Sequence, residues 1–344
     1  MSNLPPSGEI PRGAIRFNTD SNKPELWDGS QWAEFQLSTP NLGRGVDTEP
    51  GARGVIHEGN TSGGNTNTLS YLNISSTGDA LNFGDLSVTR GVAGSCSSST
   101  RGIWGGGFES PSVFDTIDFV NIASTGDATD FGNLLAATDT PGAHSNETRG
   151  LFGGGSAPSA TNTIQYVTIS STGNAVDFGD LTRAHSATRS SGNSVRAVWF
   201  GGGSSNVIDF VTISTLGNAQ EFGDLDGVKN KAGGCSSKTR IVIGGGYNPS
   251  PSLTQFNTIQ YITIMTTGNA TNFGDLTQKR EGAAAISNSI RGLFAGGYDG
   301  PSPVERFNII DYVNIATQGD AVDFGDVPTQ STSGSGCSNA HGGL

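Results

Sequence analysis

The chain has 344 residues, of which 52 are Gly, 14 are Pro and 3 are Cys, and its formal net charge at pH 7 is −12. This acidity disfavours nucleic acid as a partner, because phosphates are bound through Lys and Arg. Three cysteines cannot form a disulfide framework, no run approaches the ~18 apolar residues of a membrane-spanning helix, and the first ten residues lack the basic and apolar regions of a signal peptide.

Residues 1–11 are expected to be a short extension, after which three short strands follow. They are Arg12-Gly-Ala-Ile-Arg-Phe, Pro24-Glu-Leu-Trp-Asp and Gln31-Trp-Ala-Glu-Phe-Gln-Leu. From Arg53 onward, the sequence repeats six times. A typical copy starts with Arg149-Gly-Leu-Phe-Gly-Gly-Gly, continues with Asn162-Thr-Ile-Gln-Tyr-Val-Thr-Ile and a Ser-Thr-Gly-Asn turn, and reaches Phe178-Gly-Asp-Leu.

The repeat predicts an all-β protein built from propeller blades. The β-branched and aromatic segment carries apolar residues on both faces, with Ile164 and Tyr166 on one and Val167 and Ile169 on the other. Such a strand is expected between stacked sheets. A segment rich in small residues precedes each Arg and fits the crowded axis of a ring. Each period therefore predicts four antiparallel strands, a to d with a innermost, which form one blade of a β-propeller.

In our leading prediction, the two ends of the chain supply a seventh blade. Residues 331–341 match strand a, and the three N-terminal strands match b, c and d. Blade 7 would then combine 12–37 with 328–344, six further blades would occupy 38–327, and 12–344 would be a single domain. Closure by both termini would protect the sheet edges. The alternative is a six-bladed propeller preceded by a separate N-terminal β-hairpin module.

The repeat resembles those of Kelch-type propellers, which carry a Gly pair after strand b and aromatic residues in strands c and d, although Phe131 and Phe178 stand where Kelch repeats have Trp. The stretch from Gly13 to Trp32 resembles a segment of bacteriophage tail-fibre proteins. The Thr-Gly-Asn/Asp and Phe-Gly-Asp-Leu repeats look like those in structural proteins of marine phages, cyanophages among them. The resemblance implies a virion protein, made in the host cytoplasm without a signal peptide and present in multiple copies per particle.

One arginine per repeat is predicted to be structural, because a binding site would need it only once or twice. We expect these side chains to form ion pairs with the Asp of Phe-Gly-Asp-Leu in the same or the next blade. The arginines are Arg12, Arg53, Arg101, Arg149, Arg196, Arg240 and Arg291.

No catalytic, cofactor or metal site is predicted. The Gly runs lack the Gly-Lys-Ser/Thr of a phosphate-binding loop, and the four histidines, at 57, 144, 185 and 341, lack the spacing of metal ligands. The three cysteines, at 96, 235 and 337, are expected to be buried thiols in blades that are not neighbours. For a glycan-processing enzyme, Asp47 and Glu281 are the only candidate carboxylates. We therefore expect a protein that is not an enzyme.

Binding is expected where the blades depart from the repeat. In a propeller the b–c and d–a loops share one face, and here the b–c loops of blades 2, 5 and 6 combine aromatic residues with Pro. Aromatic side chains on stiff loops suit contacts with a sugar or a protein surface. The candidate residues are Phe108, Glu109, Tyr247, Phe256, Tyr298, Asp299, Glu305 and Arg306.

The leading functional hypothesis is a non-enzymatic virion structural protein whose propeller is a binding module on a tail fibre or appendage. Its partners would be other virion proteins and a glycan or protein of the host surface, with no nucleic acid and no membrane insertion. The second hypothesis is a protein that decorates the capsid or connects tail parts without host contact, and the third is the glycan-processing enzyme.

Overall fold

The computed structural model describes residues 11–18, 23–27, 29–34, 53–156, 158–250, 253–300 and 305–344. The regular secondary structure of these residues is all β, which confirms the predicted fold class. The chain divides into two compact units, Met1–Glu49 and Pro50–Leu344.

The first unit contains a three-stranded antiparallel sheet in the order β1 (Ile15–Asn18), β2 (Lys23–Trp27) and β3 (Trp32–Glu34). Side chains from all three strands contact one another on this sheet. The Arg16 guanidinium lies 4.2 Å from the centre of the Trp32 ring and 2.6 Å from a carboxylate oxygen of Glu25, and the Trp27 and Trp32 rings are 5.4 Å apart.

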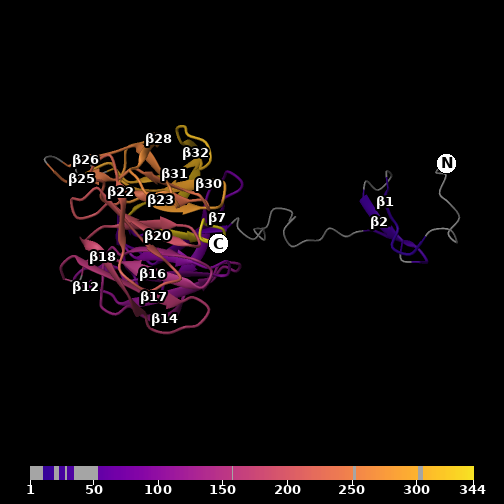
Figure 1. Cartoon of the computed structure of the whole chain (residues 1–344), viewed down its shortest axis with the longest axis horizontal. Helices are drawn as coiled ribbons and strands as arrows, with labels where there is room; N and C mark the ends of the chain where they lie inside the picture. The colour runs from indigo at the N-terminus through magenta and orange to yellow at the C-terminus, as the bar shows by residue number, and fades with distance from the viewer. Residues whose placement is uncertain are drawn as a thin grey trace. The chain divides into compact units, whose positions relative to one another are not determined.

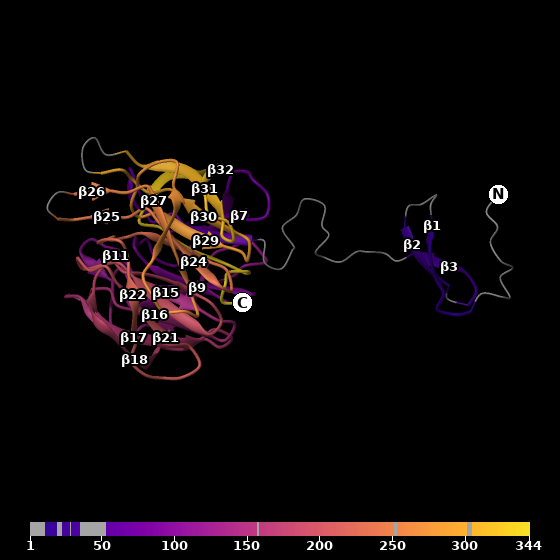
Figure 2. The same cartoon turned by 45° about the horizontal axis from the view of Figure 1, so that its top comes forward.

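The second unit is a six-bladed β-propeller with four antiparallel strands in each blade (Figures 1 and 2). In order of blades 1 to 6, strands a are β33 (Ser335–Ser338), β9 (Gly94–Ser97), β15 (Gly142–Ser145), β19 (Arg189–Gly192), β23 (Gly233–Ser236) and β29 (Ala284–Ser287). Strands b are β4 (Arg53–His57), β10 (Arg101–Gly105), β16 (Arg149–Gly153), β20 (Arg196–Phe200), β24 (Arg240–Gly244) and β30 (Arg291–Ala295). Strands c are β7 (Thr68–Asn73), β13 (Thr116–Asn121), β17 (Thr161–Thr168), β21 (Val207–Thr212), β27 (Thr258–Thr263) and β31 (Phe307–Asn314). Strands d are β8 (Leu81–Asp85), β14 (Thr129–Asn133), β18 (Val176–His185), β22 (Gln220–Asp224), β28 (Thr271–Asp275) and β32 (Val322–Thr332).

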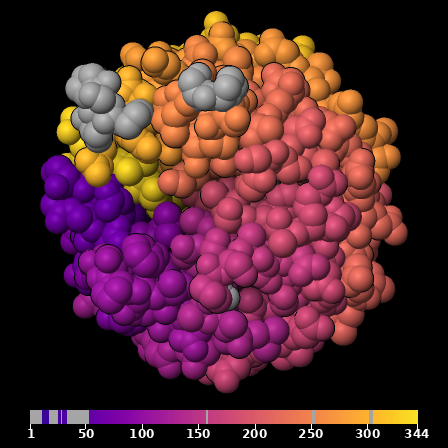
Figure 3. All heavy atoms as spheres, turned by 90° about the vertical axis from the view of Figure 1, so that its left-hand side faces the viewer, coloured from indigo at the N-terminus to yellow at the C-terminus, as the bar shows by residue number. Residues whose placement is uncertain are grey.

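The two faces of each blade are buried against the two neighbouring blades. In β17, Ile164 packs in a cluster with Trp199 and Val211 of blade 4, whereas Val167 packs with residues of blade 2 that include Ile103. This explains why strand c is apolar on both faces, as the sequence pattern predicts. Figure 3 shows the colours passing around the ring in chain order, because consecutive blades are neighbours.

The seven-blade prediction is not confirmed, and the alternative with six blades is. The C-terminal segment does form a strand a, but it completes blade 1: β33 pairs with β4, with Cys337 opposite Val55. The first strand of blade 1 along the chain is its strand b, β4. The inner edge of β4 is therefore free to pair with the strand that ends the chain. The strands predicted to be b, c and d of a seventh blade form the separate sheet β1–β2–β3.

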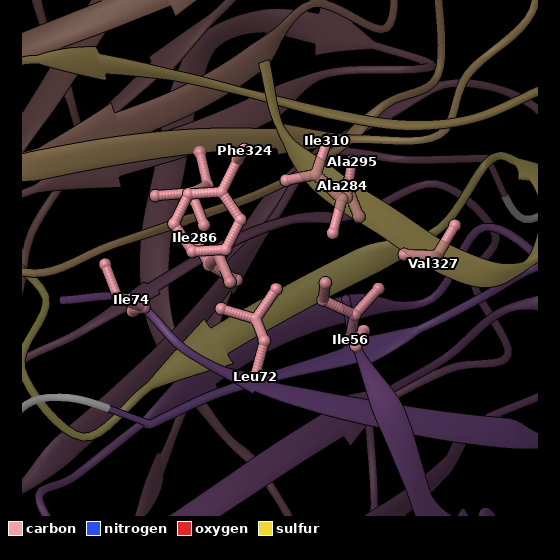
Figure 4. Close-up of a cluster of buried hydrophobic side chains, with 11 residues drawn as sticks. Ile56, Leu72, Ile74, Ala284, Ile286, Ala295, Ile310, Phe324 and Val327 are labelled. Carbon is pink, nitrogen blue, oxygen red and sulfur yellow. The ribbon is translucent and has the colours of Figure 1, made fainter. Parts of the chain in front are cut away.

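The contact between blades 6 and 1 closes the ring. Ile56 and Leu72 of blade 1 pack against Ile310 and Phe324 of blade 6 in one buried cluster (Figure 4). Two segments far apart in the sequence are thereby joined by apolar contact, in addition to the backbone hydrogen bonds of β33. The C-terminal strand β33 is therefore strand a of blade 1.

The arginine at the start of each strand b ties its blade to the next one. The Arg149 guanidinium lies 4.9 Å from the centre of the Tyr166 ring, and its Nη1 donates to the carbonyl oxygen of Ile213 in blade 4 at 2.9 Å. Equivalent pairs of contacts are made by Arg53, Arg101, Arg196, Arg240 and Arg291. Arg12 lies in the first unit and is exposed.

The expected ion pair with the Asp of Phe-Gly-Asp-Leu is wrong for the five arginines from Arg101 to Arg291. Within the described chain, none of the five from Arg101 to Arg291 forms an ion pair with that Asp. The strand register explains this, because Arg149 stands opposite Thr168 at the end of strand c, whereas Asp180 stands opposite Thr163 near its start.

The Phe-Gly-Asp motif instead fits against the Thr-Gly-Asn/Asp turn of the next blade. A Cβ atom at Gly84, where φ is +152°, would lie 2.3 Å from the carbonyl oxygen of Gly126, so only Gly fits there. The carboxylate of Asp127 in the same turn accepts the N–H of Asp85 at 3.1 Å. The same side-chain contact joins every other pair of neighbouring blades. These repeated motifs hold the ring together.

Candidate functional site: the loop face and the central channel

The b–c and d–a loops lie at the same end of the ring, which we call the loop face (Figure 3). Backbone bridges join the two kinds of loop in several blades: Gly91 with Phe108, Asn230 with Tyr247, and Glu281 with Tyr298. Figures 1 and 2 show β25 (Tyr247–Asn248) and β26 (Thr254–Gln255) on this side and the C-terminus on the other side.

Small hairpins lie on the loop face, and the first two of them contact each other. They are β5 (Asn60–Thr61) with β6 (Gly64–Asn65), β11 (Phe108–Glu109) with β12 (Ser112–Val113), and β25 with β26. The Asn65 side chain donates to the carbonyl oxygen of Phe108, and the Arg306 guanidinium donates to the side-chain oxygen of Asn60, both at 2.8 Å. β5 also pairs with the end of β32. The loops of blades 6, 1 and 2 are therefore linked into one ordered surface.

A second group of side chains surrounds Glu281 where blades 5 and 6 meet. Gln255 Nε2 donates to the Glu281 carboxylate at 3.2 Å, the Lys231 ammonium lies 3.7 Å from it, and the Tyr298 hydroxyl hydrogen-bonds to it. Burial raises the pKa of Glu281, and these three neighbours oppose that shift. Burial and the Glu281 charge raise the pKa of Tyr298 to about 12, with a further contribution from Tyr247.

The six strands a surround a central channel that contains a cavity of about 80 Å³. At the last position of these strands, serine side chains donate to the backbone carbonyl of the serine in the neighbouring blade. The chain of donors runs from Ser145 to Ser97, Ser338, Ser287 and finally Ser236. In blade 4 this position is Gly192, so the serine ring has a gap there.

The C-terminal residues close the end of the channel that lies opposite the loop face. The Gly342 N–H donates to the carbonyl oxygen of Ser236 at 3.1 Å, and His341 Nε2 donates to that of Ser97 at 3.0 Å. The ring of His341 also packs 5.4 Å from that of His144. Burial lowers the pKa of His144 to about 3 and also lowers the pKa of His341.

Comparison with known proteins adds no relative. No protein-family model matches this chain, and a search of the curated proteins finds no match. In the part of the chain that the structure describes, no helix is long and apolar enough to cross a membrane. The same residues contain no group of three or more His, Cys, Asp or Glu side chains arranged to hold a metal ion.

The predicted binding residues lie on the loop face, but the structure brings only some of them together. Tyr298 belongs to the Glu281 group, and Tyr247 and Arg306 act electrostatically on it. The Asp299 N–H donates to the carbonyl oxygen of Glu305 at 3.2 Å, so these two candidates lie together beside Tyr298. Phe108 and Glu109 lie apart from this group, in β11 of blade 2. Phe256 is half-buried and lies beneath the Lys229 ammonium at 4.4 Å, and Glu305 is exposed.

Three features of this face lie outside the sequence prediction. The hairpin of blade 1, with Asn60 and Asn65, organises the loops, and Leu253 is 43% exposed on the loop between β25 and β26. Arg189 lines the channel cavity. A signal for Arg189 exists in the repeat, because the other strands a begin with Gly, Ala or Ser. Of the two carboxylates considered for an enzyme, Glu281 belongs to the group described above and Asp47 lies outside the described residues.

Proposed function

We propose that this chain is a non-enzymatic virion structural protein whose propeller is a binding module on a tail fibre or appendage. The loop face would contact the host surface or a neighbouring virion protein. The proposal for the virion combines the likeness of residues 13–32 to a tail-fibre segment with the likeness of the blade repeat to those of phage structural proteins.

The observation that supports a binding module is that the repeated residues and the variable residues have different roles. The repeated arginines, the Phe-Gly-Asp motif and the Thr-Gly-Asn/Asp turn are used in contacts between blades. The variable b–c loops are gathered on one face and ordered by hydrogen bonds across blades, such as that from Asn65 to Phe108. Loops held in place before binding lose little conformational entropy when a partner docks.

The chemistry of this face suits a partner with both apolar and polar groups. Tyr247 is half-buried, and Leu253 and Glu305 are exposed. Tyr side chains provide contact area at a low entropy cost. Individual contacts of this kind are weak, and several copies on one particle would combine them into strong attachment.

The location of the protein is tested by immunogold electron microscopy of purified particles. Label on tail fibres or on the tail tip is the expected result. Label on the capsid would contradict the binding module and favour the decorating role, and absence of label from all particles would contradict the virion proposal.

The contact face is tested by competition, with purified protein added to host cells before particles are adsorbed. We expect Tyr247→Ala and Leu253→Ser to reduce competition about tenfold or more, because each removes a large apolar contact from the loop face. Leu216→Ser is the matched control: Leu216 is 58% exposed in the c–d turn of blade 4, on the opposite face. Loss of competition in Leu216→Ser, with Leu253→Ser and Tyr247→Ala unchanged, would place the contact on the other face.

A further inference from the structure

Arg189 is the one charged residue in the six innermost strands, which are otherwise built from Gly, Ala, Ser, Cys, Ile and one His. It stands at the first position of β19, where the other blades have Gly94, Gly142, Gly233, Ala284 and Ser335. A long cation thus replaces a small residue in a single blade of a sixfold repeat. The ring does not require an arginine here, since five blades form without one.

The Arg189 side chain lines the central cavity and lacks a carboxylate partner. Its Nη1 donates to the carbonyl oxygen of Thr188 at 3.2 Å. Among the described residues, no Asp or Glu lies within ion-pair distance of its guanidinium. This contrasts with Arg90 and Arg280, which are both paired with a buried Asp.

The cation Lys231 is a neighbour of Arg189, and the carboxylates of Glu281 and Asp139 act electrostatically on that lysine. Arg189 lowers the pKa of Lys231 electrostatically, so the two cations are near each other. Glu281 is the carboxylate in ion-pair contact with Lys231, and it already receives hydrogen bonds from Gln255 and Tyr298. Burial without a counter-charge lowers the pKa of Arg189 to about 10. Arg189 is half-buried, and a partly desolvated cation without a carboxylate partner favours an anion beside it.

The cavity has room for a small anion. Its volume of about 80 Å³ exceeds the roughly 10–15 Å³ that one water requires. The C-terminal tail closes one end through His341 and Gly342, so the loop face is the route of entry. The planar guanidinium matches two oxygens of a carboxylate or phosphate group in a bidentate contact.

We propose that the central channel binds a compact oxyanion, of the phosphate, sulfate or small carboxylate type, with the Arg189 guanidinium as its main ligand. This site is separate from the contact residues of the loop face and does not depend on the virion proposal. A free small anion or the terminal anionic group of a larger molecule would supply such an oxyanion.

The test is thermal unfolding and titration calorimetry of the full chain with sodium phosphate, sulfate or acetate, against sodium chloride at equal ionic strength. The variant is Arg189→Gln. Arg183→Gln is the matched control, because Arg183 is an exposed arginine near the end of β18, the strand that precedes β19, and its replacement changes the net charge equally. We expect at least one oxyanion to raise the unfolding temperature of the wild type and of Arg183→Gln. Arg189→Gln should bind that anion about tenfold more weakly or worse, since a charge-assisted contact is lost.

The three salts distinguish a tetrahedral oxyanion from a carboxylate. In chloride, Arg189→Gln should unfold no lower than the wild type, because it removes an unpaired charge. Arg189→Lys keeps the charge but not the planar donor pair and should bind more weakly than the wild type, which provides a second variant if Arg189→Gln fails to fold. Equal stabilisation of the wild type and Arg189→Gln would indicate a general salt effect and overturn the proposal. So would a loss of stability in Arg189→Gln without any binding to the wild type.

Discussion

One position of the repeat lies four residues after the last residue of the Phe-Gly-Asp-Leu motif, which is Leu or Val. The residue at this position and its partner in strand c of the next blade both differ from blade to blade. Where it is Arg90 or Arg280, the partner is Asp118 or Asp311, and the ion pairs, 2.9 and 2.7 Å long, are fully buried. Where it is His185, the partner is Asp209, whose charge opposes the burial that lowers the pKa of this His. The other three strands c carry a neutral residue at this position: Ser70, Gln165 and Gln260. A carboxylate is thus buried here only where the loop supplies a group that can be positive, as desolvation requires.

Removal of one member of such a pair should be far more harmful than removal of both. We expect Asp118→Ala to lower the free energy of unfolding by about 3–5 kcal/mol, because Arg90 is left buried without its counter-charge. The double variant Arg90→Met with Asp118→Leu should recover most of this loss. Denaturant unfolding measures both, and Asp130→Ala, an exposed Asp in strand d of the same blade, is the control. A loss of under about 1 kcal/mol in Asp118→Ala would mean that the pair contributes no more than a surface ion pair.

At the scale of single elements, the C-terminal strand and tail have two structural roles. β33 completes blade 1 through its pairing with β4, and the tail beyond it fills the channel end at the gap left by Gly192. The tail is held by hydrogen bonds to backbone carbonyls of Ser97 and Ser236 and by contact with His144. The pKa values of both histidines are lowered by loss of solvent contact, so the rings are neutral near pH 7 and this contact should weaken in acid.

The sign of this pH dependence follows from the lowered pKa values. Folded His144 and His57 have pKa values of about 3 and about 4, against 6.5 when unfolded. The unfolded chain therefore binds more protons, so stability is complete above pH ~6.5 and falls by about 1.4 kcal/mol per pH unit for each such His as the pH drops below that value. His144→Gln keeps a donor to the Asn193 carbonyl and removes the titration. Its unfolding temperature should fall less steeply than that of the wild type between pH 7 and 4.5, and parallel profiles would contradict the role of His144.

For the whole molecule, local sequence identifies the blades but not their number. Strand c, with Tyr166 and Val167, is predictable because β-branched and aromatic residues with two apolar faces fit only between sheets. The pairing partner of the last strand, β33, cannot be predicted in this way. The residues around Cys337 resemble every strand a, and they pair with the strand b that has a free edge. The Glu281 group could not be predicted, since the loops that bring Gln255, Lys231 and Tyr298 together come from different blades. Arg189 departs visibly from the repeat, but only the structure shows that it lines the cavity.

Two truncations distinguish the six-bladed ring from a seven-bladed one. A chain of residues 50–344 should unfold at the same temperature as the full chain, because blade 1 is completed by β33 and not by the N-terminal strands. A chain ending at residue 334 should lose its cooperative unfolding transition, because it lacks β33. The inner edge of β4 would be unpaired, and the buried cluster that Val55 forms with Trp104 and Cys337 would be uncovered. Calorimetry and circular dichroism measure both, and a peptide of residues 331–344 added to the shortened chain should restore the transition. In a seven-bladed ring, removal of residues 1–49 would take away three strands of one blade and open the ring. A large fall in the unfolding temperature of 50–344 would therefore contradict six-bladed closure, whereas its retention together with failure of the C-terminal truncation assigns closure to β33.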